Sequence, residues 1–125
     1  MKIAIQPDDY TDPAKPERID ASSPKWAELL LEAGHEIRWV NVFLPDILDQ
    51  IKGCHGFMWR WGHAGGMGRI ARRLLPILER QLGLALYPDI NTCWHYDDKI
   101  AQTYILKAAG IPIPETWIWF DNKLA

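Results

Sequence analysis

The sequence has few of the features that mark secreted, membrane-spanning or nucleic-acid-binding proteins. Its two cysteines, Cys54 and Cys93, lack C-x-x-C spacing, so neither a disulfide framework nor a zinc site is expected. No apolar run approaches the roughly 18–20 residues of a membrane span, and the first residues become polar too soon for a signal peptide. The formal net charge of −2 gives no electrostatic basis for binding nucleic acid or an anionic membrane. We therefore expect a cytoplasmic protein without nucleic-acid or membrane partners.

Motifs for covalent or metal-dependent catalysis are also missing. The chain contains neither G-x-S-x-G nor H-E-x-x-H, and its four histidines are scattered without the spacing of metal ligands. No nucleophile stands beside a base in a recognisable pattern. We predict no catalytic residue and no metal site in this chain by itself.

Tryptophan is present in unusual number, with seven among 125 residues. Trp59 and Trp61 are two positions apart, as are Trp117 and Trp119, so both rings of a pair lie on one side of a strand. Packing against covering helices is the ordinary interpretation. The alternative is that one pair belongs to a surface meant for another domain or subunit.

The order of apolar and polar segments predicts an α/β fold. Short apolar runs, typical of strands buried on both faces of a parallel sheet, lie at 2–6, 36–43, 54–61 and 84–88. Helical patterns separate them. The last of these ends at Leu82 and is interrupted by Pro76, where a kink or a late restart of the helix is expected. This alternation predicts a Rossmann-like, three-layer domain with a mostly parallel sheet of about four to five strands flanked by helices.

A glycine-rich segment after the third predicted strand is the best candidate for a binding site. Ligands on open α/β sheets bind beyond the carboxyl ends of the strands, which points to 7–9, 61–68 and 87–91. In 61–68, glycines permit close approach to a ligand, and the following helix start presents unpaired N–H groups. Further donors come from Arg60, Arg69, Arg72 and Arg73. The predicted substrate-binding residues are Arg60, His63, Gly65 and Gly66, for a carboxylate or phosphate.

The glycine segment matches no established phosphate-binding motif. It is neither G-x-G-x-x-G after a strand nor G-x-x-x-x-G-K-[ST]. A strand-to-helix loop with solvated arginines therefore stays open as the alternative, and His63 has a surface or structural role as its alternative.

The segment from Tyr87 to Trp117 contains several conformationally defined positions. A helical pattern begins at Asp97, where a carboxylate at the N-cap or in the first turn is favourable, and ends at Gly110. The prolines in 111–114 require an extended backbone. A last strand is predicted over 116–120.

This order resembles the junction at which ATP-grasp ligases pass from their N-terminal domain into the ATP-binding lobes. The matching residues are Asn91, Asp98-Lys99, Thr103, Gly110-Ile111-Pro112-Ile113-Pro114 and Thr116. The glycine segment also looks loosely like the substrate-side loop of D-alanine–D-alanine ligase-like members. Over residues 1–86 the resemblance rests on the order of the elements.

The resemblance implies a pre-ATP-grasp domain over 1–115 and the start of the connection to an ATP-grasp core over 116–125. In that family the complete enzyme uses ATP and Mg²⁺ to convert a carboxylate to an acylphosphate, which an amine or another nucleophile then attacks. Lys99 is carried over as the ATP contact, and the substrate-side loop would give Arg60 a role. The core needs about 150–200 further residues, so we expect it in cis or in trans. Alone, the chain is expected to be inactive and to bind no cofactor.

Two other interpretations stay open. The chain could be a standalone α/β binding or interaction module, with paired tryptophans as its partner surface. It could also be a flavodoxin-like or other Rossmann-like domain that binds a nucleotide or phosphate through the glycine segment. An apolar strand over 116–120, or exposed tryptophans, would in addition favour a homo-oligomer.

Overall fold

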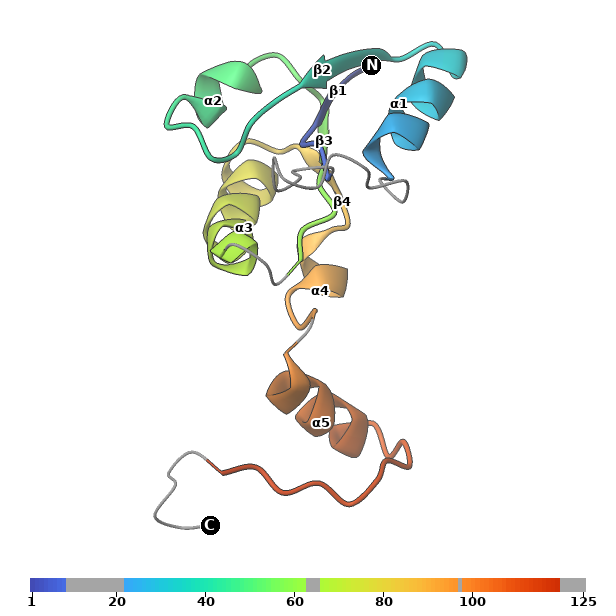
Figure 1. The fold of residues 1–125 in the computed structure, drawn as a ribbon, viewed down its shortest axis with the longest axis vertical. Coiled ribbons are helices and arrows are strands. Elements are labelled where there is room, and N and C mark those ends of the chain that lie inside the picture. Colours follow the sequence, from blue (N-terminus) through green and yellow to red (C-terminus); the bar gives the residue numbers. More distant parts are fainter. Residues whose placement is uncertain (9–21, 63–65, 97, 120–125) are drawn as a thin grey trace, which may run out of the picture. The chain divides into compact units, whose positions relative to one another are not determined.

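The computed structural model describes residues 1–8, 22–62, 66–96 and 98–119 (Figure 1). The chain divides into two compact units, the sheet unit (Met1–Cys93) and the C-terminal unit (Trp94–Ala125). His63, Gly65 and Asp97 of the predicted features lie outside the described residues.

The sheet unit is built on four parallel strands. They are β1 (Lys2–Ile5), β2 (Glu36–Trp39), β3 (Gly56–Met58) and β4 (Ala85–Tyr87), in the order β2-β1-β3-β4. Ile3 pairs with Ile37 on one side and Gly56 on the other, and Phe57 pairs with Leu86. The predicted α/β, Rossmann-like fold with a parallel sheet is confirmed.

Helices flank the sheet on both faces. They are α1 (Ser23–Glu32), α2 (Ile47–Gln50), α3 (Met67–Pro76), the π-helical turn η2 (Ile77–Gln81) and α4 (Ile90–Cys93). Ile3 and Ile5 of β1 pack with Ala27 of α1, whereas Ala4 belongs to the larger cluster, which includes residues of α2 and α3. The alternation of side chains along β1 thus separates two apolar layers, one on each face of the sheet. Figure 1 shows α1 and α3 on opposite sides of the strands.

The predicted interruption at Pro76 is confirmed. Pro76 is the last residue of α3, and the next five residues form a π-helical turn in place of a continued α-helix. Proline has no N–H to donate, and its ring excludes the carbonyl group four residues earlier, so the regular ladder cannot continue through it.

The strands are shorter than the apolar runs that predicted them. In the run 36–43, only the first four residues lie in β2, but Val40 and Val42 remain buried in the larger cluster. The hydrogen bond of the Val42 N–H is not part of the sheet. This group donates to Oε1 of the buried Gln6 at 2.7 Å. The apolar run 36–43 therefore predicts which residues are buried better than it predicts which residues pair in the sheet.

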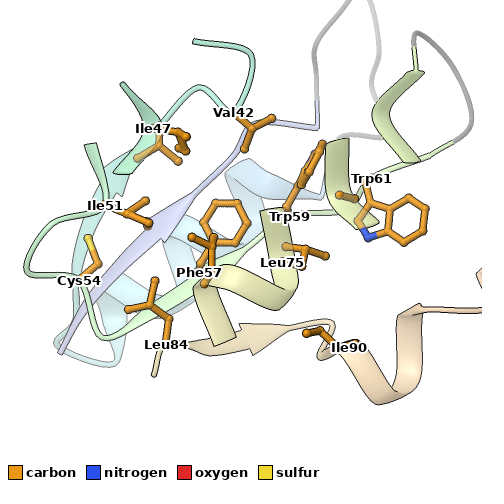
Figure 2. Close-up of a cluster of buried hydrophobic side chains, with 14 of the residues drawn as sticks. Val42, Ile47, Ile51, Cys54, Phe57, Trp59, Trp61, Leu75, Leu84 and Ile90 are labelled. Atoms are coloured by element: carbon orange, nitrogen blue, oxygen red, sulfur yellow. The ribbon is translucent and has the colours of Figure 1, made fainter. Parts of the chain in front are cut away.

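Trp59 and Trp61 are packing residues of the larger cluster, as the ordinary interpretation predicts. Their exposed fractions are 1% and 5%. The Trp59 ring meets Phe43 and Phe57 edge to face, with centroid distances of 6.4 and 6.5 Å. In Figure 2, Trp59 lies beside Phe57 and Leu75, and Trp61 lies at the margin of the cluster. The second pair differs, since Trp117 and Trp119 are exposed.

The C-terminal unit contains α5 (Lys99–Ala108) and a segment without regular secondary structure over 111–119. Asp98 is the N-cap of α5, one residue later than the predicted helix start, and its Oδ1 accepts a hydrogen bond from the Ala101 N–H at 2.9 Å. Gly110 follows the helix with a φ of 66°, as its predicted role requires.

The predicted strand over 116–120 is wrong for its described residues. None of residues 111–119 lies in a strand, and Phe120 is outside the described ranges. A strand needs a hydrogen-bonded neighbour, and the described part of the C-terminal unit offers none. None of the helices described in either unit has the length and apolar character to cross a membrane.

Candidate functional site

The strand order reverses between β1 and β3. From β1 the chain crosses to β2 on one side, and from β2 it returns across β1 to β3 on the other. The carboxyl ends of β1 and β3 therefore diverge into connections that leave in opposite directions, which is where open α/β sheets bind ligands. Asp8 follows β1 at this point, and Arg60 follows β3.

Asp8 holds the start of α1. Its Oδ2 accepts a hydrogen bond from the Ser22 N–H at 2.7 Å. Its Oδ1 accepts from the Ser23 N–H at 3.0 Å and from the Ser23 hydroxyl at 2.6 Å. Arg60 joins these residues, because its Nη1 donates to the Ser22 Oγ at 3.1 Å and lies 3.8 Å from Asp8 Oδ2. We call Asp8, Ser22, Ser23 and Arg60 the Asp8 cluster.

The Asp8 carboxyl has a lowered pKa. Burial by itself would raise the pKa, but the hydrogen bonds from the Ser23 hydroxyl and from the amides of Ser23 and Ser22 outweigh it. The side chain is only 5% exposed. The cluster therefore stabilises a buried negative charge between the end of β1 and the start of α1.

The lowered pKa gives Asp8→Asn an expected pH dependence. A carboxyl with a folded-state pKa below its ordinary 3.8 stabilises the fold at higher pH, and this contribution is lost as the pH falls through the folded-state value. At about pH 7 the variant should lose about 1.5–3 kcal/mol of unfolding free energy, typical of hydrogen bonds to a charged group. Urea unfolding from about pH 7 to about pH 3 should show the difference shrinking. Asp49→Asn, at an exposed site, is the control, and a difference independent of pH would contradict the assignment.

A hollow of about 490 Å³ lies at the start of α3. It is lined by Trp61, Gly66, Gly68, Arg69 and Arg72. Gly66 precedes α3 with a φ of 75°, a conformation that glycine adopts without strain. Both arginines are exposed and one helical turn apart, and neither forms a salt bridge within the described ranges. Their guanidinium groups suit a carboxylate or phosphate.

The described substrate-binding residues that were predicted from the sequence do not lie at one site. Gly66 lines the hollow, but Arg60 does not, because its side chain is held in the Asp8 cluster. The neighbouring residue Trp61 belongs to the cluster that includes α3. The strand-end rule did indicate the segment containing Asp8. The hydrogen bonds of Asp8 with Ser22 and Ser23 join residues far apart in the sequence, and no local sequence pattern predicts them.

Lys99 is the first residue of α5 and lines a separate groove. This groove has a volume of about 310 Å³ and is also lined by Gln102, Thr103, Leu106, Ile113, Pro114 and Thr116. The Lys99 Nζ donates to Gln102 Oε1 at 3.1 Å. A cation in the first turn of a helix is unfavourable for the helix dipole, so the lysine is not explained by helix stability.

Neither cysteine has the surroundings of a reactive thiol. Cys54 and Cys93 are buried and unpaired, and burial raises the pKa of each thiol. Within the ranges that the structure describes, no three His, Cys, Asp or Glu side chains gather as a metal site requires.

No protein-family model matches the chain, and neither a curated protein nor a solved structure matches it significantly. The function of this protein must therefore be inferred from its own residues and contacts.

Proposed function

We propose that this chain is the N-terminal, substrate-side domain of an ATP-grasp type ligase, which joins a carboxylate to an amine or a similar nucleophile through an acylphosphate. The ATP-binding lobes would be supplied in cis or in trans. The observation that carries this proposal is the uncovered apolar surface of the C-terminal unit, at the position where the sequence resembles the junction to those lobes.

The C-terminal unit leaves its large apolar side chains exposed. None of the ten residues of α5, all of them described, is buried. The exposed large apolar residues of this unit are Trp94, Tyr96, Ile100, Tyr104, Ile105, Ile111, Trp117 and Trp119. So many large apolar side chains exposed within one small unit are typical of an interaction site. In the proposed enzyme, the ATP lobes would cover it.

Lys99 supplies the proposed contact to ATP. Its ammonium group is solvent-exposed on the groove beside α5, has three donors suited to phosphate oxygens, and donates to the neutral side chain of Gln102. When bound, ATP with its Mg²⁺ would supply the phosphoryl group that activates the carboxylate. The described residues of this chain include no carboxylate cluster for the metal, so the Mg²⁺ ligands are assigned to the ATP lobes.

The hollow at the start of α3 is the proposed substrate-side surface. Gly66 and Gly68 keep it open, and Arg69 and Arg72 present cations to it. An acid substrate would be held there by charge-assisted hydrogen bonds. Arg60 is not assigned to this surface, because its side chain is held in the Asp8 cluster.

The test is to tag the protein in its source cell, purify it under native conditions and measure the intact mass of the tagged polypeptide. A chain of about 35–45 kDa, or a co-purifying chain with the missing lobes, is expected. The preparation should also release phosphate from MgATP only when a carboxylate and an amine are both added. A lone chain of 14.4 kDa plus the mass of the tag, with no ATP-using partner, would instead support a standalone binding module.

A further inference from the structure

The start of α1 has the position of a phosphate site in a sheet of this topology. It follows the central strand β1, next to the point where the strand order reverses. Unpaired N–H groups at a helix start bind phosphate well, and α/β domains use the helix after the first strand for this purpose.

In this protein an anion already lies at that position. The Asp8 carboxylate accepts hydrogen bonds from the Ser22 and Ser23 amides and from the Ser23 hydroxyl. The segment after β3 adds a positive charge: Arg60 Nη1 lies 3.8 Å from the same carboxylate. Two amides, a hydroxyl and a guanidinium are the donors that an oxyanion would use.

We propose that Asp8 is a built-in anion that closes the oxyanion site at the start of α1, so that the sheet unit rejects phosphate there. The carboxylate uses the amide donors and is itself 5% exposed, which leaves an incoming anion no access to them. Its negative charge would in addition repel a phosphate within a few ångströms. The nucleotide-binding topology is thereby kept while nucleotide binding at its usual place is lost.

This proposal does not depend on the proposed ligase function. It concerns only this chain and inorganic phosphate, and it holds for a standalone module as well. It also predicts where a latent site will appear, because removing the Asp8 side chain leaves the same donors without their anion.

The experiment compares wild type, Asp8→Ala and Asp8→Ala/Arg60→Ala by thermal unfolding in sodium phosphate and in sodium chloride at matched ionic strength. Matching removes general salt screening from the comparison. Asp8→Ala should unfold at a lower temperature than wild type in chloride. Phosphate about fivefold above its dissociation constant should then raise its midpoint by about 4–8 °C. Wild type, the double variant and the control Asp49→Ala should show no such selective gain.

A second measurement uses the wild-type chain and tests whether the site is closed to phosphate, even if Asp8→Ala fails to fold. The amide resonances of Ser22 and Ser23 are followed by NMR while phosphate is added. Unchanged resonances support a closed site, and saturable shifts overturn it. The proposal is also overturned if folded Asp8→Ala gains no more from phosphate than Asp49→Ala does.

Discussion

Replacing Trp59 by alanine is expected to remove about 3–5 kcal/mol of unfolding free energy. Trp59 is the largest of the fully buried side chains and contacts two aromatic rings, those of Phe43 and Phe57. Its removal takes away apolar burial and leaves a cavity that the surrounding sheet and helix cannot fill. Domains of this size have only about 5–15 kcal/mol in total, so the variant should lose a large fraction of its stability.

The measurement is urea unfolding followed by circular dichroism, with Trp39→Ala as the matched control. Trp39 is the last residue of the edge strand β2 and is 50% exposed, so its truncation leaves no internal cavity. We expect the control to lose less than about 1 kcal/mol. Equal losses at both positions would show that the contacts of Trp59 do not determine the stability of the sheet unit.

The sheet could be predicted because its information is local. Each strand is a short run of apolar residues, and parallel strands covered on both faces need such runs. Pro76 and Gly110 were also predictable, since each acts through its own backbone chemistry at one position. The limits of the strands were not, because Val40 and Val42 are as apolar as strand residues but are buried beyond the end of β2.

The candidate site could be predicted only in part. It depends on the face of the sheet toward which each side chain turns in the segment after its strand. Sequence placed Arg60 with the glycine segment, but consecutive residues turn to opposite faces. Arg60 therefore joins Ser22 and Asp8, while Trp61 lines the hollow with Arg69. Asp8 shows the same limit, since its partners follow a long intervening segment. The helix start at Lys99 was found to within two residues because capping is a local signal.

In the protein with its ATP lobes, Lys99→Ala is expected to lower kcat/KM for ATP by about 10- to 150-fold. This corresponds to the loss of one charge-assisted hydrogen bond to phosphate, about 1.5–3 kcal/mol. In the isolated chain the same change should alter the unfolding free energy by less than about 0.5 kcal/mol, because Lys99 is exposed and its Nζ donates to Gln102, a side chain of the same helix. A large kinetic effect with almost no effect on stability distinguishes a ligand contact from a structural residue.

Lys107→Ala is the matched control for this prediction. Lys107 is also an exposed lysine of α5, but it lies in the last turn, where a cation is favourable for the helix dipole. Its loss should leave the kinetics with ATP unchanged. Lys99→Arg keeps the charge while changing the geometry of the donors, so partial recovery of kcat/KM would assign the effect to charge. Wild-type kinetics in Lys99→Ala would reject the ATP contact. The exposed apolar side chains of the C-terminal unit would then still indicate a junction with another domain or subunit. The identification of that partner as the ATP lobes would lose its support, because it depends on the phosphate contact of Lys99.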